Sequence, residues 1–393
     1  MTEMELLMNK TKVRMGMVGG AQGAFIGAIH RIAARLDGLI ELVAGSFSSD
    51  PARSQATAAM LGINPSRCYD SYQQMFIEEA KLPADQRIDF VAIVTPNHLH
   101  FPIAKLAIES GFHVLSDKPA TLNLQEALLL EQTLQSSDCL YGLTHTYTGY
   151  PMIKEARHRI AQGELGTIRK VVVEYSQGWL SSSEDEQAKQ AKWRLDPQQA
   201  GISCCIADIG VHAANLAEYV SNLEITALCA DLNQVVPGRT LDDDGTVLLR
   251  FNTGCKGVLM ASQVALGEEN NLNLRIYGDK ASIQWSQMEP NSLWLKSHNA
   301  PTTLLRAGVA LKSQAAQNAL RAPAGHPEGY LEAFANIYVN FAKQIEAKKA
   351  GSLAANTDFD VPGIKEAIRG MAFIENAVEA SSLDTKWQPF QIG

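Results

Sequence analysis

The chain has 393 residues, of which 46% are apolar and 19% are charged, and it is long enough for two domains with hydrophobic cores. Its formal net charge of −8 argues against a nucleic-acid partner, because such proteins need a basic surface. No apolar run reaches the ~18 residues that a membrane span requires, and the first residues lack the features of a signal peptide. The six cysteines show no metal-like spacing, so we expect reduced thiols in a cytoplasmic protein and no metal site.

Strands and helices are expected to alternate from residue 13 to residue 144, after a flexible start at residues 1–11. The expected strands are 13–18, 40–46, 89–95, 113–116 and 140–144, and the expected helices are 29–36, 50–61, 72–80, 102–110 and 124–135. Asp50 is expected to cap the second of these helices, with Pro51 at its first position. The alternation predicts an α/β domain with a parallel sheet and right-handed crossovers, and we place its boundary near residue 125, within the helix 124–135.

The pattern changes over residues 126–393. The expected strands are 168–177, 225–236, 246–251, 257–264, 272–277, 281–285 and 292–295, and the expected helices are 203–220, 328–347 and 363–380. Turn signals at 252–254 and 278–280 suit hairpins, so these strands predict a mostly antiparallel sheet in an α+β domain. The polar stretch 181–192 is expected to be a solvated loop or helix, with a mobile lid as the alternative.

A glycine-rich turn, 16–31, follows the first strand and opens the first helix, as in dinucleotide-binding proteins. Its spacing differs from G-x-G-x-x-G, because Gly19, Gly23 and Gly27 recur every four residues. Backbone N–H groups at such a helix N-terminus can hold a pyrophosphate, and the alternative is a tight turn that only packs the helix on the strand. The residues expected to contact a dinucleotide here are Gly19, Gly23, Ala24, Phe25 and Ile26.

The end of the second strand bears on the choice between NAD and NADP. An acid there would hold the ribose hydroxyls of NAD, but this chain has no carboxylate at the expected tip. Ser48 and Arg53 lie nearby and are compatible with a 2′-phosphate, which favours NADP slightly. Asp50 is better explained as the helix cap, so both cofactors stay open.

Two further segments end strands of the first domain. Thr95, Asn97 and His100 follow the third strand and are expected to face the nicotinamide end of a cofactor, with an ordinary capped helix start as the alternative. Asp117 and Lys118 end the fourth strand, just before a proline that stops it. Because ligands bind at the carboxyl ends of parallel strands, Lys118 is expected to meet the ligand, and an exposed turn lysine is the alternative.

The predicted helix 203–220 carries Asp208, His212 and Asn215 on one face, at positions i, i+4 and i+7. An acid one turn before a histidine can orient the ring and hold its tautomer, whereas the alternative is a surface ion pair. Zinc is a weaker option, because two ligands are too few for a zinc site.

Oxidation of a secondary alcohol would use three of these side chains together. A nicotinamide accepts the hydride, and the protein must take the hydroxyl proton and stabilise the developing negative charge. A histidine titrates near neutral pH, and an ammonium beside the oxygen favours an alkoxide-like transition state. Lys118, Asp208 and His212 are therefore the expected donor, orienting acid and base.

These segments together resemble the Gfo/Idh/MocA oxidoreductase family over nearly the whole chain. The family's motifs E-K-P, G-x-x-x-D-x-G-x-H and T-P-N-x-x-H correspond to residues 117–119, 204–212 and 95–100. The resemblance implies a Rossmann dinucleotide-binding domain, a second domain with an open sheet, and Lys118, Asp208 and His212 as the catalytic residues. The chain departs from the family in a longer first turn and at three positions, with Asp117 for glutamate, Cys204 for glycine and Asn215 for a common aspartate.

Four runs narrow the resemblance. Residues 19–31, 144–151, 193–197 and 325–338 look like those of enzymes that oxidise levoglucosan, L-glucose or scyllo-inositol. This branch implies a sugar or cyclic polyol as substrate, NAD more often than NADP, and a homodimer or homotetramer built through the open sheet. The residues that it implies for substrate binding are Tyr147, Arg194, Asp208, His212 and His326.

Two other functions stay open. Some relatives oxidise a sugar transiently to cleave a glycosidic bond, with no net turnover of the cofactor. A regulator that senses sugar or nucleotide without catalysis is the other, although a sensor needs none of the three expected catalytic residues.

Overall fold

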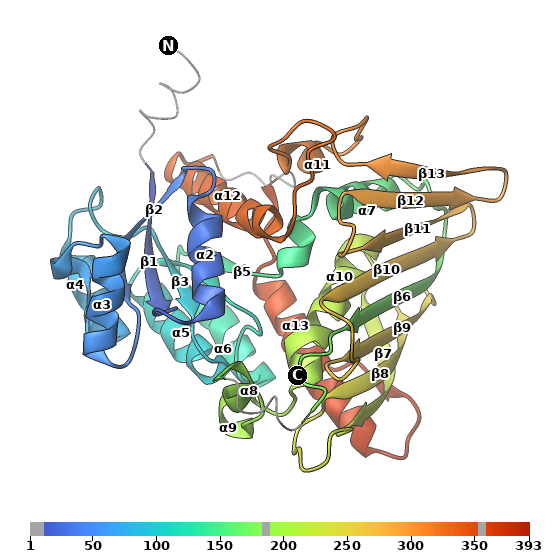
Figure 1. The fold of residues 1–393 in the computed structure, drawn as a ribbon, viewed down its shortest axis with the longest axis horizontal. Coiled ribbons are helices and arrows are strands. Elements are labelled where there is room, and N and C mark those ends of the chain that lie inside the picture. Colours follow the sequence, from blue (N-terminus) through green and yellow to red (C-terminus); the bar gives the residue numbers. More distant parts are fainter. Residues whose placement is uncertain (1–11, 183–188, 353–358) are drawn as a thin grey trace.

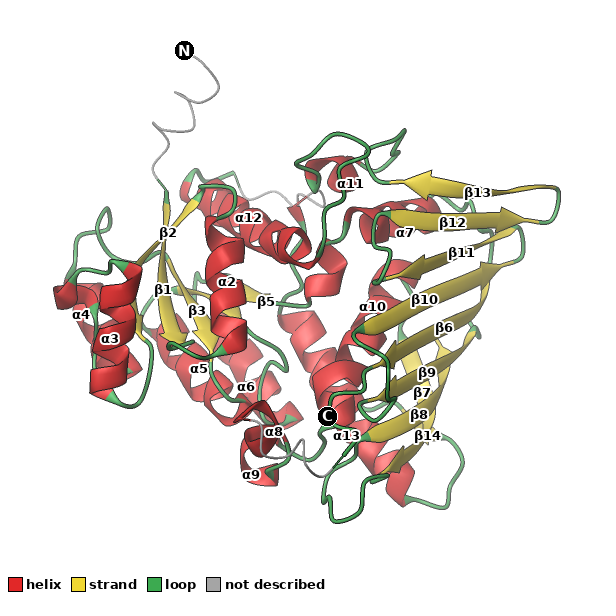
Figure 2. Ribbon diagram, in the orientation of Figure 1, coloured by secondary structure: helices red, strands yellow, loops and turns green. Residues whose placement is uncertain are grey.

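Two β-sheets form the framework of the protein in the computed structural model, which describes residues 12–182, 189–352 and 359–393 (Figures 1 and 2). The expected flexible start at residues 1–11 lies outside the described residues, as do residues 183–188 of the expected polar loop or lid. Within the described ranges, no helix is long and apolar enough to cross a membrane.

The first sheet has five parallel strands in the order β2-β1-β3-β4-β5. Its strands are β1 (Val13–Gly19), β2 (Ile40–Ser46), β3 (Phe90–Val94), β4 (His113–Ser116) and β5 (Tyr141–Leu143). All five residues of the central strand β3 are buried, as its unbroken apolar sequence predicts for a strand covered on both faces. The expected parallel α/β domain is confirmed.

Helices lie on both faces of this sheet (Figure 1). They include α2 (Phe25–Arg35), α3 (Pro51–Leu61), α4 (Tyr72–Lys81), α5 (His100–Glu109) and α6 (Leu124–Gln135). The carboxylate of Asp50 accepts a hydrogen bond from the backbone N–H of Ala52 at 3.0 Å, so the expected cap of α3 is confirmed. Helix α2 begins four residues earlier than expected, directly inside the glycine-rich turn.

The strand order reverses between β1 and β3, because β2 lies beside β1 and β4 lies beside β3. The carboxyl edge of a parallel sheet binds ligands at such a reversal. The glycine-rich turn leaves β1 at this edge, and the segments that begin at Thr95, Asp117 and Thr144 leave β3, β4 and β5 there. The topology therefore gathers all the expected first-domain site segments along one edge.

The second sheet has nine strands in the order β13-β12-β11-β10-β6-β9-β8-β7-β14, and only the β6–β9 pair is parallel. The strands are β6 (Ile168–Ser176), β7 (Ile225–Asn233), β8 (Asp244–Phe251), β9 (Lys256–Ser262), β10 (Asn271–Gly278), β11 (Ala281–Ser286), β12 (Ser292–Ser297), β13 (Ala300–Arg306) and β14 (Gln388–Pro389). The mostly antiparallel sheet is confirmed. Strand β13 was not expected, because nearly all its residues are exposed and no apolar alternation marks it.

One face of the second sheet is covered by helices that lie between the two sheets, and the far face is bare in the described part of the chain (Figure 2). The remaining helices are α7 (Pro151–Ala161), α8 (Lys189–Arg194), α9 (Pro197–Ala200), α10 (Val211–Ser221), α11 (Gln314–Asn318), α12 (Tyr330–Lys349) and α13 (Ile364–Ser382). Helix α7 was not expected. It buries Lys154, Glu155 and Arg159, whose charges pair with other side chains and obscure the apolar stripe of the sequence.

The predicted continuous helix 203–220 contains an irregular turn. Residues Ile206–Gly210 form a π-helical turn, and the regular helix α10 begins only at Val211. A π turn holds one more residue than an α turn, so it changes the direction in which the side chains before it point relative to those after it. This difference separates Asp208 from His212 in a way that a regular i, i+4 spacing does not predict.

Helix α12 returns to the first domain near the end of the chain. Its residues Phe334, Tyr338 and Phe341 belong to the same hydrophobic core as Met15 and Met17 of β1. The fifth strand of the first sheet, β5, also lies beyond residue 125. The domain division at residue 125 stays a prediction, and these contacts favour a first domain that takes in residues from both sides of it.

Candidate active site

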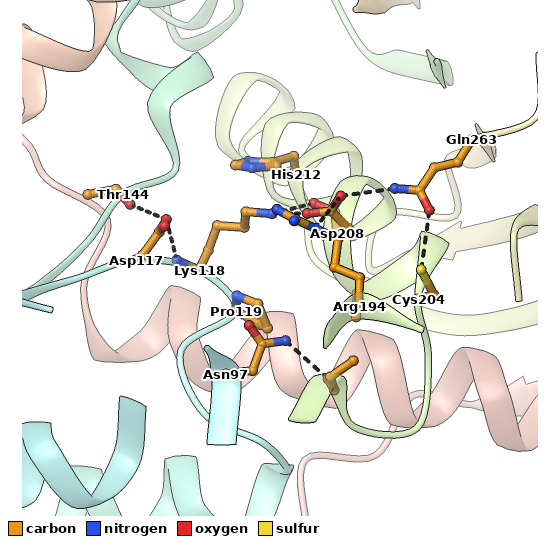
Figure 3. A network of polar contacts seen from close by, with 12 residues as sticks. Asn97, Asp117, Lys118, Pro119, Thr144, Arg194, Cys204, Asp208, His212 and Gln263 are labelled. Atoms are coloured by element: carbon orange, nitrogen blue, oxygen red, sulfur yellow. Dashed lines mark hydrogen bonds and ion pairs between the residues drawn. The ribbon is translucent and has the colours of Figure 1, made fainter. Parts of the chain in front are cut away.

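The side chain of Lys118 extends from the first domain to Asp208 in the second (Figure 3). Lys118 lies two residues beyond the end of β4 and is joined to Pro119 by a cis peptide bond. The ammonium Nζ donates to the carboxylate Oδ1 of Asp208 at 2.7 Å and to the backbone carbonyl of Asp208 at 2.7 Å. The structure thus brings together two of the three expected catalytic residues.

The carboxylate of Asp208 is surrounded by donors. Its Oδ2 accepts a hydrogen bond from the amide of Gln263 at 2.9 Å and lies 3.3 Å from Nε of Arg194. Burial alone would raise the pKa of Asp208, but the charges of Arg194 and Lys118 outweigh burial and hold that pKa below its usual range. Asp208 is therefore an anion that fixes the position of the Lys118 ammonium.

His212, on the first turn of α10, is buried beside this ion pair. Burial, with the charge of Lys118, lowers the pKa of His212 well below 6.5, so the ring is neutral at neutral pH. A neutral ring has a nitrogen lone pair and can accept a proton. His212 therefore has the protonation state that a base requires.

Asp208 does not orient this ring as the sequence suggested. Within the described residues no hydrogen bond joins the two side chains, because the π-helical turn directs Asp208 toward Lys118, Arg194 and Gln263. The partner of His212 is His145, which follows β5, with the two Nδ1 atoms 3.3 Å apart.

Asp117 anchors the turn that presents Lys118. Its Oδ1 accepts hydrogen bonds from the backbone N–H of Lys118 at 2.8 Å and from the hydroxyl of Thr144 at 3.0 Å, and its Oδ2 lies 3.7 Å from Nε2 of His30. Burial opposes ionisation, but His30 and then Lys118 lower the pKa of Asp117 below its usual range. This anion holds three elements together at the carboxyl edge of the sheet.

The segment after β3 is tied to its neighbours. His100 is buried, and its ring nitrogens lie 2.6 Å from the carbonyl of Pro119 and 2.9 Å from that of Thr95. Asn97 donates to the carbonyl of Ala200 at 3.0 Å, which joins this segment to α9. His100 and Asn97 thus shape the edge of the site, and their direct contact with a cofactor stays a prediction.

The glycine-rich turn fits a dinucleotide phosphate. Gly19 has φ +85°, and a Cβ there would lie 2.3 Å from the carbonyl of Val94, so only glycine allows the turn to pass this close to β3. Gly23 has φ +81° and faces open space. No side chain caps the N-terminus of α2, so its first N–H groups remain available to an anion. We infer that Gly19, Gly23, Ala24, Phe25 and Ile26 would hold the pyrophosphate.

The residues near the end of β2 make contacts within the protein. The guanidinium of Arg53 donates to the carbonyl of Gln22 in the glycine-rich turn at 2.7 Å, and the hydroxyl of Ser48 accepts from the backbone N–H of Asp50 at 3.2 Å. Arg53 therefore braces the turn, and neither contact decides between NAD and NADP.

Among the expected substrate-binding residues, Tyr147 and Arg194 join the cluster. The ring of Tyr147 packs edge-on against His212, with ring centres 4.9 Å apart, and its hydroxyl bonds to the hydroxyl of Tyr175. The Arg194 guanidinium lies against the ring of Trp193, 4.3 Å from its centre. His326 is exposed, and its ring contacts the carbonyl of its own neighbour Pro323 at 3.1 Å, so its role stays a prediction.

Three residues of this cluster were missed by sequence reasoning. They are Thr144, His145 and Gln263, which bind Asp117, His212 and Asp208. Thr144 and His145 stand at the end of the fifth strand, so their place at the carboxyl edge was a usable signal. Gln263 follows β9 of the second sheet, and the residues around it in the sequence carry no such signal.

A hollow of about 1650 Å³ lies elsewhere, at the amino ends of the first-sheet strands. Charged side chains around it pair with one another, as Arg14 does with Asp89 and Lys348 with Asp138. It lies at the edge opposite Lys118 and is not part of the site.

The parallel sheet, its glycine-rich turn and the cluster at its carboxyl edge define a dinucleotide-dependent oxidoreductase. Residues 13–145 match the Gfo/Idh/MocA family described as "Oxidoreductase family, NAD-binding Rossmann fold", and residues 153–284 match its C-terminal domain. The chain is 33% identical over 383 residues to the "Uncharacterized oxidoreductase YfiI" of Bacillus subtilis, covering 96% of this chain and 97% of that one. It belongs to the Gfo/Idh/MocA oxidoreductase family.

Solved structures agree with this assignment. An oxidoreductase from Sinorhizobium meliloti is 44% identical, with a TM-score of 0.86, and the match covers 96% of this chain and 100% of that one. An inositol dehydrogenase homologue from Azotobacter vinelandii, in complex with NAD⁺, is 34% identical with a TM-score of 0.93, covering 97% and 98%. Its complex with NADH and myo-inositol matches at 33% identity with a TM-score of 0.90, covering 97% and 98%.

Proposed function

We propose that the protein transfers a hydride between a secondary hydroxyl-bearing carbon of a cyclic polyol or sugar and NAD or NADP. The observation that carries the proposal is the contact of Lys118 with Asp208, beside the neutral His212. Lys118 stabilises negative charge on the substrate oxygen, Asp208 fixes Lys118, and His212 takes the hydroxyl proton. The nicotinamide, when bound, supplies the hydride acceptor.

A polyhydroxylated substrate suits the surroundings of His212. Arg194, Tyr147 and Asn270 supply polar groups around the ion pair, and Asn270 donates to the hydroxyl of Tyr147 at 3.2 Å. Such groups can exchange hydrogen bonds with ring hydroxyls. The A. vinelandii relative, which binds myo-inositol, supports an inositol or another ring of similar size.

A screen of inositols, anhydrosugars and aldoses, with NAD and NADP in parallel, tests the proposal by absorbance of the reduced cofactor. We expect reduction with at least one polyol, and a loss of about 10³-fold in kcat/KM for Lys118→Ala and for His212→Ala. The matched controls Lys105→Ala and His158→Ala alter residues outside the cluster and should keep full activity.

Other outcomes would point to the two alternatives. Glycoside cleavage with tightly retained NAD and no steady reduction would favour transient oxidation. Cofactor binding without turnover of any compound in the screen would favour a sensor. Full activity of either active-site variant would reject the assignment of that residue.

We further propose that the protein is a cytoplasmic homodimer or homotetramer that assembles through the bare face of the second sheet. Half-exposed apolar side chains lie on outward positions of this sheet, at Leu248, Met260, Tyr277, Trp294 and Leu304. All six cysteines are free thiols, as a reducing compartment would keep them. Light scattering on Met260→Lys should show smaller particles than the wild-type protein, and a wild-type monomer would contradict this assembly.

A further inference from the structure

His145 contacts the proposed base and has no role in the mechanism above. Its Nδ1 lies 3.3 Å from Nδ1 of His212, and the two rings meet edge to face with their centres 5.3 Å apart. The side chain is almost fully buried. Its backbone N–H donates to the carbonyl of Leu143 at 2.8 Å, and its carbonyl accepts from the hydroxyl of Thr148 at 2.9 Å. These bonds fix the backbone from which the ring projects.

One of the two Nδ1 atoms must carry a hydrogen and the other a lone pair, because two lone pairs or two N–H groups would repel each other. A neutral imidazole carries its hydrogen on only one of its nitrogens. If Nδ1 of His145 donates, His212 carries its own hydrogen on Nε2 and cannot accept a proton there. If Nδ1 of His212 donates, Nε2 of His212 has a free lone pair. The direction of this hydrogen bond decides whether His212 can be a base at Nε2.

Both rings are neutral at neutral pH. Burial, together with the charge of Lys118, lowers the pKa of His145 to about 3 and that of His212 well below 6.5. The other neighbours are engaged elsewhere, since Asp208 binds Lys118 and the hydroxyl of Tyr147 bonds to another tyrosine. Within the described ranges, His145 is therefore the residue that hydrogen-bonds to the ring of His212.

We propose that His145 is a positioning residue that accepts the Nδ1–H of His212 and so keeps the lone pair of this base on Nε2. The proposal rests on the proposed function. When the O–H bond of the substrate hydroxyl breaks, an Nε2–H bond forms on His212, and its Nδ1–H stays bonded to His145. A carboxylate in this place would hold the proton on His212 more tightly, whereas a neutral acceptor orients the ring and lets the proton leave again.

The tautomer of His212 tests this proposal without substrate or turnover. Long-range ¹H–¹⁵N correlations on ¹⁵N-histidine-labelled protein report which ring nitrogen carries hydrogen, and the loss of signals in His212→Gln identifies the ring. We expect the Nδ1–H tautomer in the wild-type protein and in His145→Asn, whose side-chain oxygen can accept the same bond. We expect a shift toward the Nε2–H tautomer in His145→Leu, which fills the space without an acceptor.

An Nε2–H tautomer of His212 in the wild-type protein overturns the proposal, and so does an unchanged tautomer in His145→Leu. If His145→Leu does not fold, the wild-type spectrum alone still decides, because it shows which ring donates.

Activity supplies a second measurement. We expect kcat to fall about 10²-fold in His145→Leu with little change in KM, and His145→Asn to recover most of this loss. The control His158→Leu, on α7, should match the wild type. Equal losses in the asparagine and leucine variants would overturn the positioning role. A wild-type protein that oxidises no polyol contradicts the proposed function instead, and the tautomer then still decides the role of His145.

Discussion

The ammonium of Lys118 lies 2.7 Å from the carboxylate of Asp208, although 90 residues separate them in the chain. The side chains are only 14% and 16% exposed, so water screens this pair weakly. The contact joins the carboxyl edge of the first sheet to the π-helical turn of the second domain. A change of either partner therefore leaves an uncompensated buried charge and also misplaces a group of the site.

Asp208→Asn is expected to lower both stability and turnover. Loss of the anion leaves the cations of Lys118 and Arg194 facing a neutral amide, which should cost about 3 kcal/mol in the free energy of unfolding. A displaced ammonium should also lower kcat about 10²-fold. Urea unfolding and steady-state kinetics measure the two effects. Asp138→Asn, at a carboxylate that is 94% exposed, is the matched control, and a wild-type kcat in Asp208→Asn would contradict the expectation.

Gln263 is expected to support the same carboxylate from behind. Its amide donates to Asp208 at 2.9 Å and its carbonyl accepts from the thiol of Cys204 at 3.4 Å, in a fully buried position. Gln263→Leu removes both bonds and should lower the free energy of unfolding by about 2 kcal/mol and kcat about tenfold. A variant with lower stability but unchanged kcat would show that Gln263 serves the fold alone.

Three glycine-to-alanine variants separate strain from cofactor binding. Gly19→Ala should destabilise the protein by about 3 kcal/mol or more, because its Cβ would meet the backbone carbonyl of Val94, which cannot move aside. Gly23→Ala meets nothing and should cost only about 1 kcal/mol for its positive φ. It should nevertheless weaken NAD binding about tenfold or more, because the methyl group would lie where the pyrophosphate must approach.

Gly62→Ala is the control for this series. Gly62 has φ +71° and open space around it, at the C-terminus of α3, so its strain matches that of Gly23. Thermal unfolding should show equal losses of stability in Gly23→Ala and Gly62→Ala. NAD titration by fluorescence should show weaker binding only in Gly23→Ala. Equal affinities in these two variants would remove Gly23 from the cofactor site.

Stability is expected to fall in acid because of buried neutral histidines. Burial, and then the charge of Lys348, lowers the pKa of His113 to about 4 in the folded protein, whereas the unfolded value is about 6.5. Between these values the unfolded chain binds a proton that the folded protein does not. The stability that His113 contributes is thus present above pH 6.5 and lost as the pH falls toward 4.

His113→Gln measures this contribution. Glutamine can accept the hydrogen bond that the ring takes from the backbone N–H of Leu140, but it does not titrate. Between pH 7.5 and 5.5 the wild-type protein should lose about 1.4 kcal/mol more than the variant in urea unfolding. Identical losses would show that His113 takes up its proton without unfolding.

Much of the first domain was predictable because its signals are local. The strands 40–46 and 113–116 and the helix 124–135 agree with β2, β4 and α6 residue for residue, since apolar runs end at turn residues or caps there. The place of Lys118 was predictable for a topological reason, because the carboxyl ends of parallel strands share one edge. The same rule places His145 at that edge, because it follows β5.

The missed elements lack such local signals. Helix α7 buries Lys154 and Glu155 against partners distant in the chain, such as Asp360 for Lys154, so its apolar stripe is interrupted. Strand β13 is an exposed edge whose pairing with β12 alone makes it a strand. The packing of α12 on the first domain depends on contacts hundreds of residues apart, and no window of sequence reports them.

The sequence alone determined the alternation of elements, the glycine-rich turn and the identities of the three chemical groups, because periodicity and residue type are properties of neighbours. Only the tertiary structure decided which groups meet. Asp208 lies in a π-helical turn and binds Lys118, whereas His212 is bonded to His145, which follows β5. Hydrogen bonds form over about 3 Å, so a rotation of a single turn reassigns partners that spacing in the chain had paired.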